Sequence, residues 1–320
     1  MSGVTTATML PEPEALAEFH PTERLAPNAR PTGPWRDQLR RIPSARNAFG
    51  VVLLYAQTIA IVVAAVHFDN LFVWAAAFVL MGRAHAQFAA LMHEASHRLL
   101  FRNKRVNDWV GRWLLGFPSF TPIDLYRRGH MAHHRDEFGP DEPDIPLYRG
   151  YPIERASLRR KLTRDASGQT GYKLFKGLLR GLRTTDKAVQ SQARRIVGTQ
   201  LVLIAIGVAL GHPWVYFILW FAPYLTVWRV INRLRSIAEH GGMQRSKDRR
   251  LTTHSVQQSF LSRFFLVPFH IGWHLAHHVD SGVPMANLPK LHAELRRSGY
   301  VNDVIEYPSY LALWRKLSSR

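Results

Sequence analysis

Four long apolar stretches constrain this 320-residue chain more than any other feature of its sequence. A helix needs about 20 apolar residues to cross the hydrocarbon layer of a membrane. The first, second and fourth stretches reach that length and the third is marginal. The stretches form two pairs. A short polar break separates the two members of each pair, at Asp69–Asn70 in the first pair and at Gly211–Pro213 in the second. We therefore expect an all-α, multi-pass membrane protein with four transmembrane helices in two hairpins, against the alternative of buried helices in a large soluble protein. The four stretches are residues 50–68, 71–92, 196–212 and 213–231.

Basic residues predict how these spans are oriented. The chain has 42 Lys and Arg against 23 Asp and Glu, and neither hairpin tip contains Lys or Arg. Because basic segments stay on the cytoplasmic side, residues 93–195 and 232–320 should form a helical cytoplasmic cap, with both termini on that side. A nucleic-acid partner is disfavoured, since no nucleic-acid-binding motif appears. Attraction to anionic membrane lipid explains the charge more simply.

The first 46 residues differ in composition from the rest. They are polar and interrupted by prolines, a pattern typical of a mostly disordered segment. Residues 35–46 are compatible with a short amphipathic helix on the membrane surface. We therefore divide the chain into an N-terminal cytoplasmic segment, 1–46, and a membrane domain, 47–320.

Histidines are the second unusual feature. There are 16 of them and no cysteine, which excludes disulfides, thiolate zinc sites, iron–sulfur clusters and a cysteine nucleophile. On a helix, positions i, i+3 and i+4 share one face, so a cluster with this spacing can direct its imidazoles at one point. Imidazole binds iron, zinc and copper. Eight histidines form three such clusters: His93 and His97; His130, His133 and His134; His274, His277 and His278.

The number of clustered histidines favours two metals, because a zinc site takes three or four protein ligands. A zinc protease would use the first cluster, an HExxH motif, but would leave both HxxHH clusters unexplained. A metal transporter or sensor would need ionisable residues along several spans. Only Arg83 and His85 lie well inside one.

The three clusters resemble the histidine boxes of the membrane fatty acid desaturase and hydroxylase superfamily, and they follow the two pairs of spans as the boxes do there. Three further stretches are similar to the desaturase branch. The resemblance covers roughly residues 85–297. The three stretches are the acidic Asp141–Asp144, Arg235–His240 with its R-x-x-x-E-H pattern, and Asn287–His292 with the sequence N-L-P-K-L-H.

This resemblance implies a chemistry. The eight box histidines and His240 would ligate two irons, and O2 would be the co-substrate. The reaction would introduce a double bond into the acyl chain of a lipid or an acyl thioester. Electrons would come from a separate ferredoxin- or cytochrome-type donor, because the sequence lacks its own redox-domain motifs. A di-iron hydroxylase or ketolase acting on a lipid or hydrocarbon uses the same boxes and stays open. The compact chain favours the bacterial inner membrane.

Several neighbours of the boxes are candidates for supporting roles. Carboxylates commonly accept hydrogen bonds from ligating imidazoles, although plain salt bridges are an alternative. His270 stands where many members have asparagine, and it is a candidate tenth ligand, a holder of metal-bound water, or neither. Trp273 is a candidate to line the substrate cavity or to anchor the chain at the membrane interface. The candidates for hydrogen bonding near the metals are Glu94, Asp141, Asp144, Glu239 and Arg235.

Overall fold

The computed structural model describes residues 9–16, 18–140 and 142–319. They are mostly helical, as predicted. The strands among them are β1 (Ser255–Val256) and β2 (Glu306–Tyr307), which pair in parallel. The chain divides into two compact units. The first unit contains residues up to 42, 129–160 and 233–320, and the second contains residues 43–128 and 161–232. Three helices contain residues of both units: α5 (Ile123–Arg135), α7 (Arg155–Ala166) and α12 (Val227–His240).

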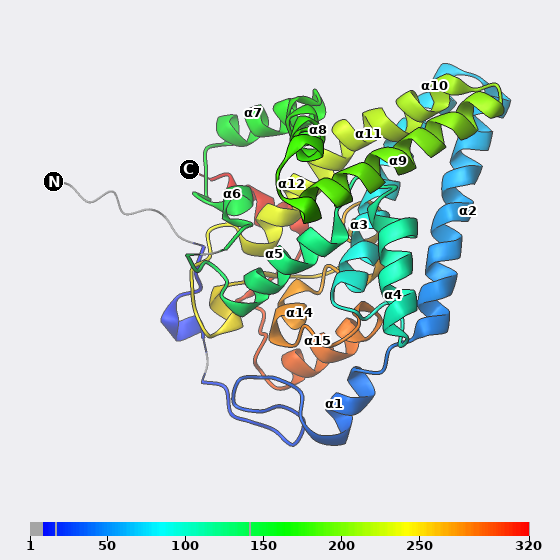
Figure 1. Cartoon of the computed structure of the whole chain (residues 1–320). Helices are drawn as coiled ribbons and strands as arrows, with labels where there is room; N and C mark the ends of the chain where they lie inside the picture. The colour runs from blue at the N-terminus through cyan, green and yellow to red at the C-terminus, as the bar shows by residue number, and fades with distance from the viewer. Residues whose placement is uncertain (1–8, 17, 141, 320) are drawn as a thin grey trace. The chain divides into compact units, whose positions relative to one another are not determined.

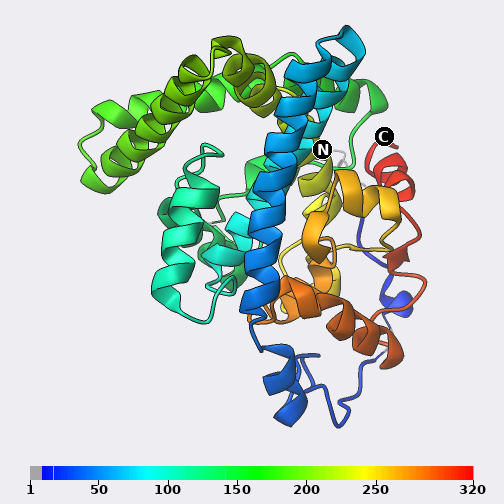
Figure 2. The same cartoon turned by 90° about the vertical axis from the view of Figure 1, so that its right-hand side faces the viewer.

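The second unit contains the long apolar helices, and Figures 1 and 2 show α2 as a long blue helix without interruption. Its α2 and α3 pack together through the rings of Tyr55 and Phe88, whose centroids are 5.4 Å apart. Two segments, η2 and η4, are π-helical. The unit comprises α2 (Ser44–Phe68), α3 (Leu71–Ser96), α4 (Lys104–Val110), η2 (Gly111–Gly116), α8 (Gln169–Arg180), η3 (Gly181–Arg183), α9 (Lys187–Ala209), α10 (Pro213–Val215), η4 (Tyr216–Phe221) and α11 (Ala222–Leu225).

Four helices are long and apolar enough to cross a membrane: Gly33–Phe68, Leu71–Ser96, Lys187–Ala209 and Pro213–His240. Each contains one of the stretches expected from the sequence or most of it. The helices extend beyond the apolar residues, because hydrogen bonding continues through polar ends. The turn between α2 and α3 follows from its two residues. Asp69 has a left-handed backbone (φ 38°), and the side chain of Asn70 caps α3 by accepting from the Val73 amide at 3.0 Å.

The fourth span is not one continuous α-helix. Its backbone breaks at Thr226, where φ is −118° and ψ is −85°. Two glycines let neighbouring helices approach this break closely. A Cβ at Gly171 of α8 would lie 2.3 Å from the Leu225 carbonyl oxygen, and one at Gly82 of α3 would lie 2.3 Å from Val227 Cγ1. A side chain larger than glycine would therefore clash with the Leu225 backbone at position 171 and with the Val227 side chain at position 82.

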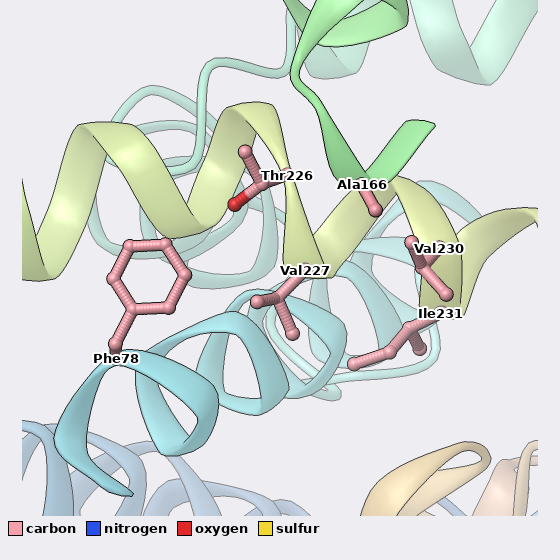
Figure 3. Close-up of a pocket in the computed structure, with 6 residues that line it drawn as sticks. All are labelled: Phe78, Ala166, Thr226, Val227, Val230 and Ile231. Atoms are coloured by element: carbon pink, nitrogen blue, oxygen red, sulfur yellow. The ribbon is translucent and has the colours of Figure 1, made fainter. Parts of the chain in front are cut away.

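A cavity of about 250 Å³ lies beside this break. Figure 3 shows Phe78 of α3 projecting toward the backbone that carries Thr226 and Val227. The Thr226 hydroxyl donates to the Ala222 carbonyl at 2.7 Å, so its hydrogen already has a partner. The cavity therefore suits an apolar occupant. Its lining residues are Phe78, Ala166, Thr226, Val227, Val230 and Ile231.

Several buried polar side chains in the second unit donate to backbone carbonyls. His85 is fully buried and its Nε2 donates to the Trp220 carbonyl of η4 at 3.0 Å. The Trp220 indole in turn donates to the Pro118 carbonyl at 3.0 Å. Gln200 of α9 donates to the Phe117 carbonyl at 2.8 Å. His85 thus packs within the helices of this unit.

The first unit contains short helices joined by loops, with α14 and α15 drawn in orange in Figure 1. Its core residues include Leu288, Leu291 and Leu295 on one face of α15. The unit comprises η1 (Pro13–Ala15), α1 (Gly33–Leu39), α6 (Ile145–Tyr148), η5 (Arg249–Leu251), β1, α13 (Phe260–Phe265), η6 (Pro268–His270), α14 (His274–Val279), η7 (Met285–Asn287), α15 (Leu288–Arg297), β2 and α16 (Tyr310–Leu317).

The N-terminal segment differs from its expected disorder where the structure describes it. Leu25 and Leu39 are buried. Arg40 pairs with Asp280, and Arg24 pairs with Glu294. Two arginines of this segment pair with carboxylates far along the chain, which composition does not reveal. Residues 1–8, also part of that expectation, lie outside the described residues.

Candidate metal centre

Three helical segments of the first unit carry histidines toward common points. The end of α5 carries His130, His133 and His134, and the short α14 carries the third box. His240 is the last residue of α12. In each box the i, i+3, i+4 spacing places the imidazoles on neighbouring faces of one helix.

Four of these side chains form a buried cluster, here called the four-histidine cluster. Each contributes a ring nitrogen, and these atoms all lie within 4.8 Å of one another. The Nε2 atoms of His240 and His278 each lie 3.0 Å from Nε2 of His274. The members are His133, His240, His274 and His278.

Hydrogen bonds to the Nδ1 atoms of these rings indicate what kind of group could bind where the Nε2 atoms converge. His240 Nδ1 lies 2.8 Å from the Thr252 carbonyl oxygen, which can only accept, so Nδ1 carries the hydrogen. His278 Nδ1 likewise donates to Glu137 Oε1 at 2.7 Å. In neutral rings both Nε2 atoms then present lone pairs to His274, which has one Nε2 hydrogen at most. A central cation resolves this arrangement, and the donor set therefore fits a metal.

Two carboxylates behind the ligating faces were not identified from the sequence as partners of the boxes. Glu137 accepts from His278, and Glu142 Oε2 lies 2.7 Å from His133 Nδ1. Both are buried. Arg249 also donates to Glu137. The available signal was weak: Glu137 follows His134 by three residues, and Glu142 lies inside the acidic stretch already noted.

The direction of the pKa shift suits two members of the cluster to metal binding. Burial, followed by the charges of neighbouring histidines, lowers the pKa of both His274 and His278 well below 6.5. Burial also lowers the pKa of His133, but the hydrogen bond and charge of Glu142 outweigh it and the net pKa is raised. His274 and His278 are therefore neutral near pH 7, the form in which imidazole binds metal.

A second group in the first unit, here called the three-histidine group, comprises His130, His134 and His277. His134 Nε2 lies 3.1 Å from His130 Nε2 and 3.0 Å from His277 Nε2. Nε2 atoms converge here as they do in the four-histidine cluster. Because α14 supplies His277 to this group and His274 and His278 to the other cluster, its position controls both.

The first box lies in the second unit. His93 is in the last turn of α3 and His97 is its C-cap, with ring centroids 4.8 Å apart. Glu94, between them in sequence, is buried. The Ser96 hydroxyl donates to the His93 carbonyl at 2.6 Å, and Arg127 donates to the Ser96 carbonyl at 2.8 Å. These bonds fix the helix end that carries the box.

Two of the acidic candidates lie near the four-histidine cluster. The Asp144 carboxylate falls with His133 and Glu142 in a group whose ligand atoms are within 4.8 Å. Arg235 donates to Glu239 Oε1 at 2.6 Å, and this oxygen lies 3.5 Å from His274 Nδ1. Asp141 lies outside the described residues.

The remaining candidates take other positions. Trp273 stacks on His292 with centroids 4.0 Å apart, immediately before α14. His270 ends η6 with a left-handed backbone (φ 69°). Among the described residues, the groups close enough to share a metal do not include His270.

Comparison with known proteins agrees with this geometry. The fatty acid desaturase family matches residues 70–307. A dihydrorhizobitoxine desaturase of Bradyrhizobium elkanii is 28% identical over 67% of this chain and 65% of its own. A sphingolipid delta(4)-desaturase DES1-like protein of Oryza sativa subsp. japonica is 26% identical over 71% of this chain and 64% of its own. An sn-1 oleoyl-lipid 12-desaturase of Arthrospira platensis is 40% identical over 18% of this chain and 16% of its own.

The chain thus spans just under two thirds of the length of the two relatives that it matches most extensively. The matched family region contains all three histidine boxes, His240 and both carboxylates behind the four-histidine cluster. The resemblance drawn from the boxes is confirmed, and the chain belongs to the fatty acid desaturase family.

Proposed function

We propose that the protein is an O2-dependent desaturase that introduces a double bond into an acyl chain at a histidine-ligated di-iron site. The observation that carries this proposal is the convergence of Nε2 atoms in the four-histidine cluster. Membership of the family supplies the reaction class.

The ligands of the two irons are proposed as follows. One iron is held by His133, His240, His274 and His278. The three-histidine group serves the other, and the family resemblance assigns His93 and His97 to it as well. All-imidazole ligation accommodates redox-active iron.

The side chains of this site hold and shield rather than react. Bound iron with O2 supplies the strong oxidant that removal of hydrogen from an unactivated methylene needs. Glu137 and Glu142 keep the Nδ1 hydrogens of His278 and His133 in place, so that each Nε2 stays free to ligate. The ring centroids of Tyr148 and Phe138 lie 5.1 Å and 6.2 Å from the centroid of the His240 ring. They exclude water from that side of the cluster.

An acyl chain is the proposed substrate. Two of the three relatives are named for lipid substrates, and the cavity beside Thr226 has an apolar lining. The four apolar helices are proposed to cross the membrane as two hairpins, with the boxes and both termini in the cytoplasm of a bacterial cell. A separate ferredoxin- or cytochrome-type protein is the proposed electron donor.

The test is a reconstituted assay. The full chain in lipid nanodiscs is supplied with ferredoxin, its reductase, NADPH, O2 and phospholipids carrying saturated and monounsaturated chains. The proposal expects acyl chains that have lost two hydrogens, and no such product from His278→Ala. His212→Ala, a histidine outside the boxes at an exposed turn, should retain the wild-type rate. Hydroxylated or ketone products would make the protein a hydroxylase or ketolase instead.

A further inference from the structure

The third histidine box rests on a helix that cannot fix its own position. α14 contains six residues, His274–Val279. A helix this short is unstable alone, because nucleation costs more than so few hydrogen bonds return. Contacts at its ends must therefore hold the imidazoles of His274, His277 and His278 in place.

Arg40, which lies between α1 and α2, binds one of these ends. Its Nε and Nη2 donate to Asp280 Oδ2 at 3.0 Å and Oδ1 at 2.6 Å. Asp280 is the C-cap of α14, and its side chain is 4% exposed. The Gly282 amide donates to the same Oδ1 at 3.0 Å. A Cβ at Gly282 would lie 2.9 Å from Arg40 Cζ, so the guanidinium lies directly against the chain there.

Further contacts from the same segment reinforce this end. Arg30 Nε donates to the Val279 carbonyl at 3.2 Å. Val279 is the last residue of α14, where helix carbonyls lack internal partners and favour a cation. Asn287 of η7 donates to the Leu39 carbonyl at 2.8 Å. Leu39 itself is buried, and Asn287 also donates to the Arg41 carbonyl at 3.4 Å, so the segment is anchored on both sides of Arg40.

We infer that residues 30–41 form a clasp that positions the third histidine box, with Arg40 as its main positioning residue. The inference rests on the proposed function, because it concerns the metal site proposed above. A two-bond fork restrains orientation as well as distance. Asp280 follows His278 by two residues, so a shift of the C-cap moves the ligands of both histidine groups. The clasp lies before the family-matched residues 70–307.

The test variant removes both charges together. Arg40→Ala with Asp280→Asn leaves no buried unpaired carboxylate, and the asparagine oxygen can still accept from the Gly282 amide. Arg24→Ala is the matched control. This substitution breaks the ion pair between Arg24, which precedes the clasp, and Glu294 on α15. Glu294 keeps Arg297 as a partner.

Two measurements on the full chain in detergent test whether the clasp positions α14. For Fe²⁺ in competition with a chelator, the double variant should bind about 10- to 100-fold more weakly than wild type, the usual effect of losing support behind a metal ligand. Arg24→Ala should bind as wild type does. In metal-free protein, the amide hydrogens of residues 274–280 should exchange faster in the double variant than in wild type. In the control they should exchange at the wild-type rate.

The outcomes separate this inference from the proposed function. Equal Fe²⁺ affinity and equal exchange in the double variant and wild type would overturn the clasp. Equal losses in the double variant and in Arg24→Ala would also overturn it, because they would show general stabilisation. If wild type binds no Fe²⁺, the proposed function fails, and the exchange experiment still decides whether the clasp holds α14.

Discussion

At the scale of single residues, two neighbouring carboxylates of the first unit face different surroundings. Glu137 is buried and accepts from His278 Nδ1, whereas Asp136 pairs with Arg245 at the surface. A buried carboxylate behind an imidazole sets its tautomer and raises its basicity as a ligand. An exposed ion pair contributes about 0–1 kcal/mol and touches no ring.

Glu137→Gln should therefore weaken Fe²⁺ binding about 10- to 100-fold, because the negative charge that supports His278 is lost. Asp136→Asn should leave the affinity unchanged. Both affinities can be measured by chelator competition in detergent. An equal effect of the two substitutions would contradict a specific role for Glu137.

Residue patterns indicated which histidines lie together more readily than which groups support them. The boxes could be recognised because helical spacing alone places their imidazoles together. Glu137 and Thr252 could not be identified in this way, since they reach the rings through loop geometry. Arg40 meets Asp280 across 240 residues of sequence, and no local pattern encodes such a pair.

At the scale of elements, the break in the fourth span shows where apolar composition is insufficient. The sequence predicts one helix over residues 213–231, but the backbone turns out of α geometry at Thr226. Helix α8 at Gly171 and helix α3 at Gly82 pack closely against the residues on either side of this break. Hydropathy reports that a segment is apolar and does not report which neighbours approach its backbone.

Two glycines of α8 test this packing. Gly171→Ala should destabilise the protein by about 1–3 kcal/mol, because the new methyl group would overlap the Leu225 backbone. Gly177→Ala, on the same helix with open space around its Cβ, should be neutral or stabilise by up to about 1 kcal/mol. Thermal unfolding in detergent measures both. Equal behaviour of the two variants would argue against close packing at the break.

At the scale of the whole molecule, the proposed membrane topology can be tested directly because the chain has no cysteine. His212→Cys lies at the exposed turn between the third and fourth spans, and Ser167→Cys lies at an exposed turn between α7 and α8. A membrane-impermeant maleimide should label His212→Cys in intact spheroplasts. It should label Ser167→Cys only after the spheroplasts are lysed. The reverse pattern would invert the orientation, and labelling of both in intact spheroplasts would contradict the four-span topology.

The metal content of the purified protein tests the central claim most directly. Elemental analysis of the full chain should find two irons per molecule in wild type. His240→Ala combined with His278→Ala should lose at least one of them, since it removes two of the four converging nitrogens. One zinc per chain, retained in this double variant, would contradict the di-iron account and indicate a metal held by the HExxH box alone.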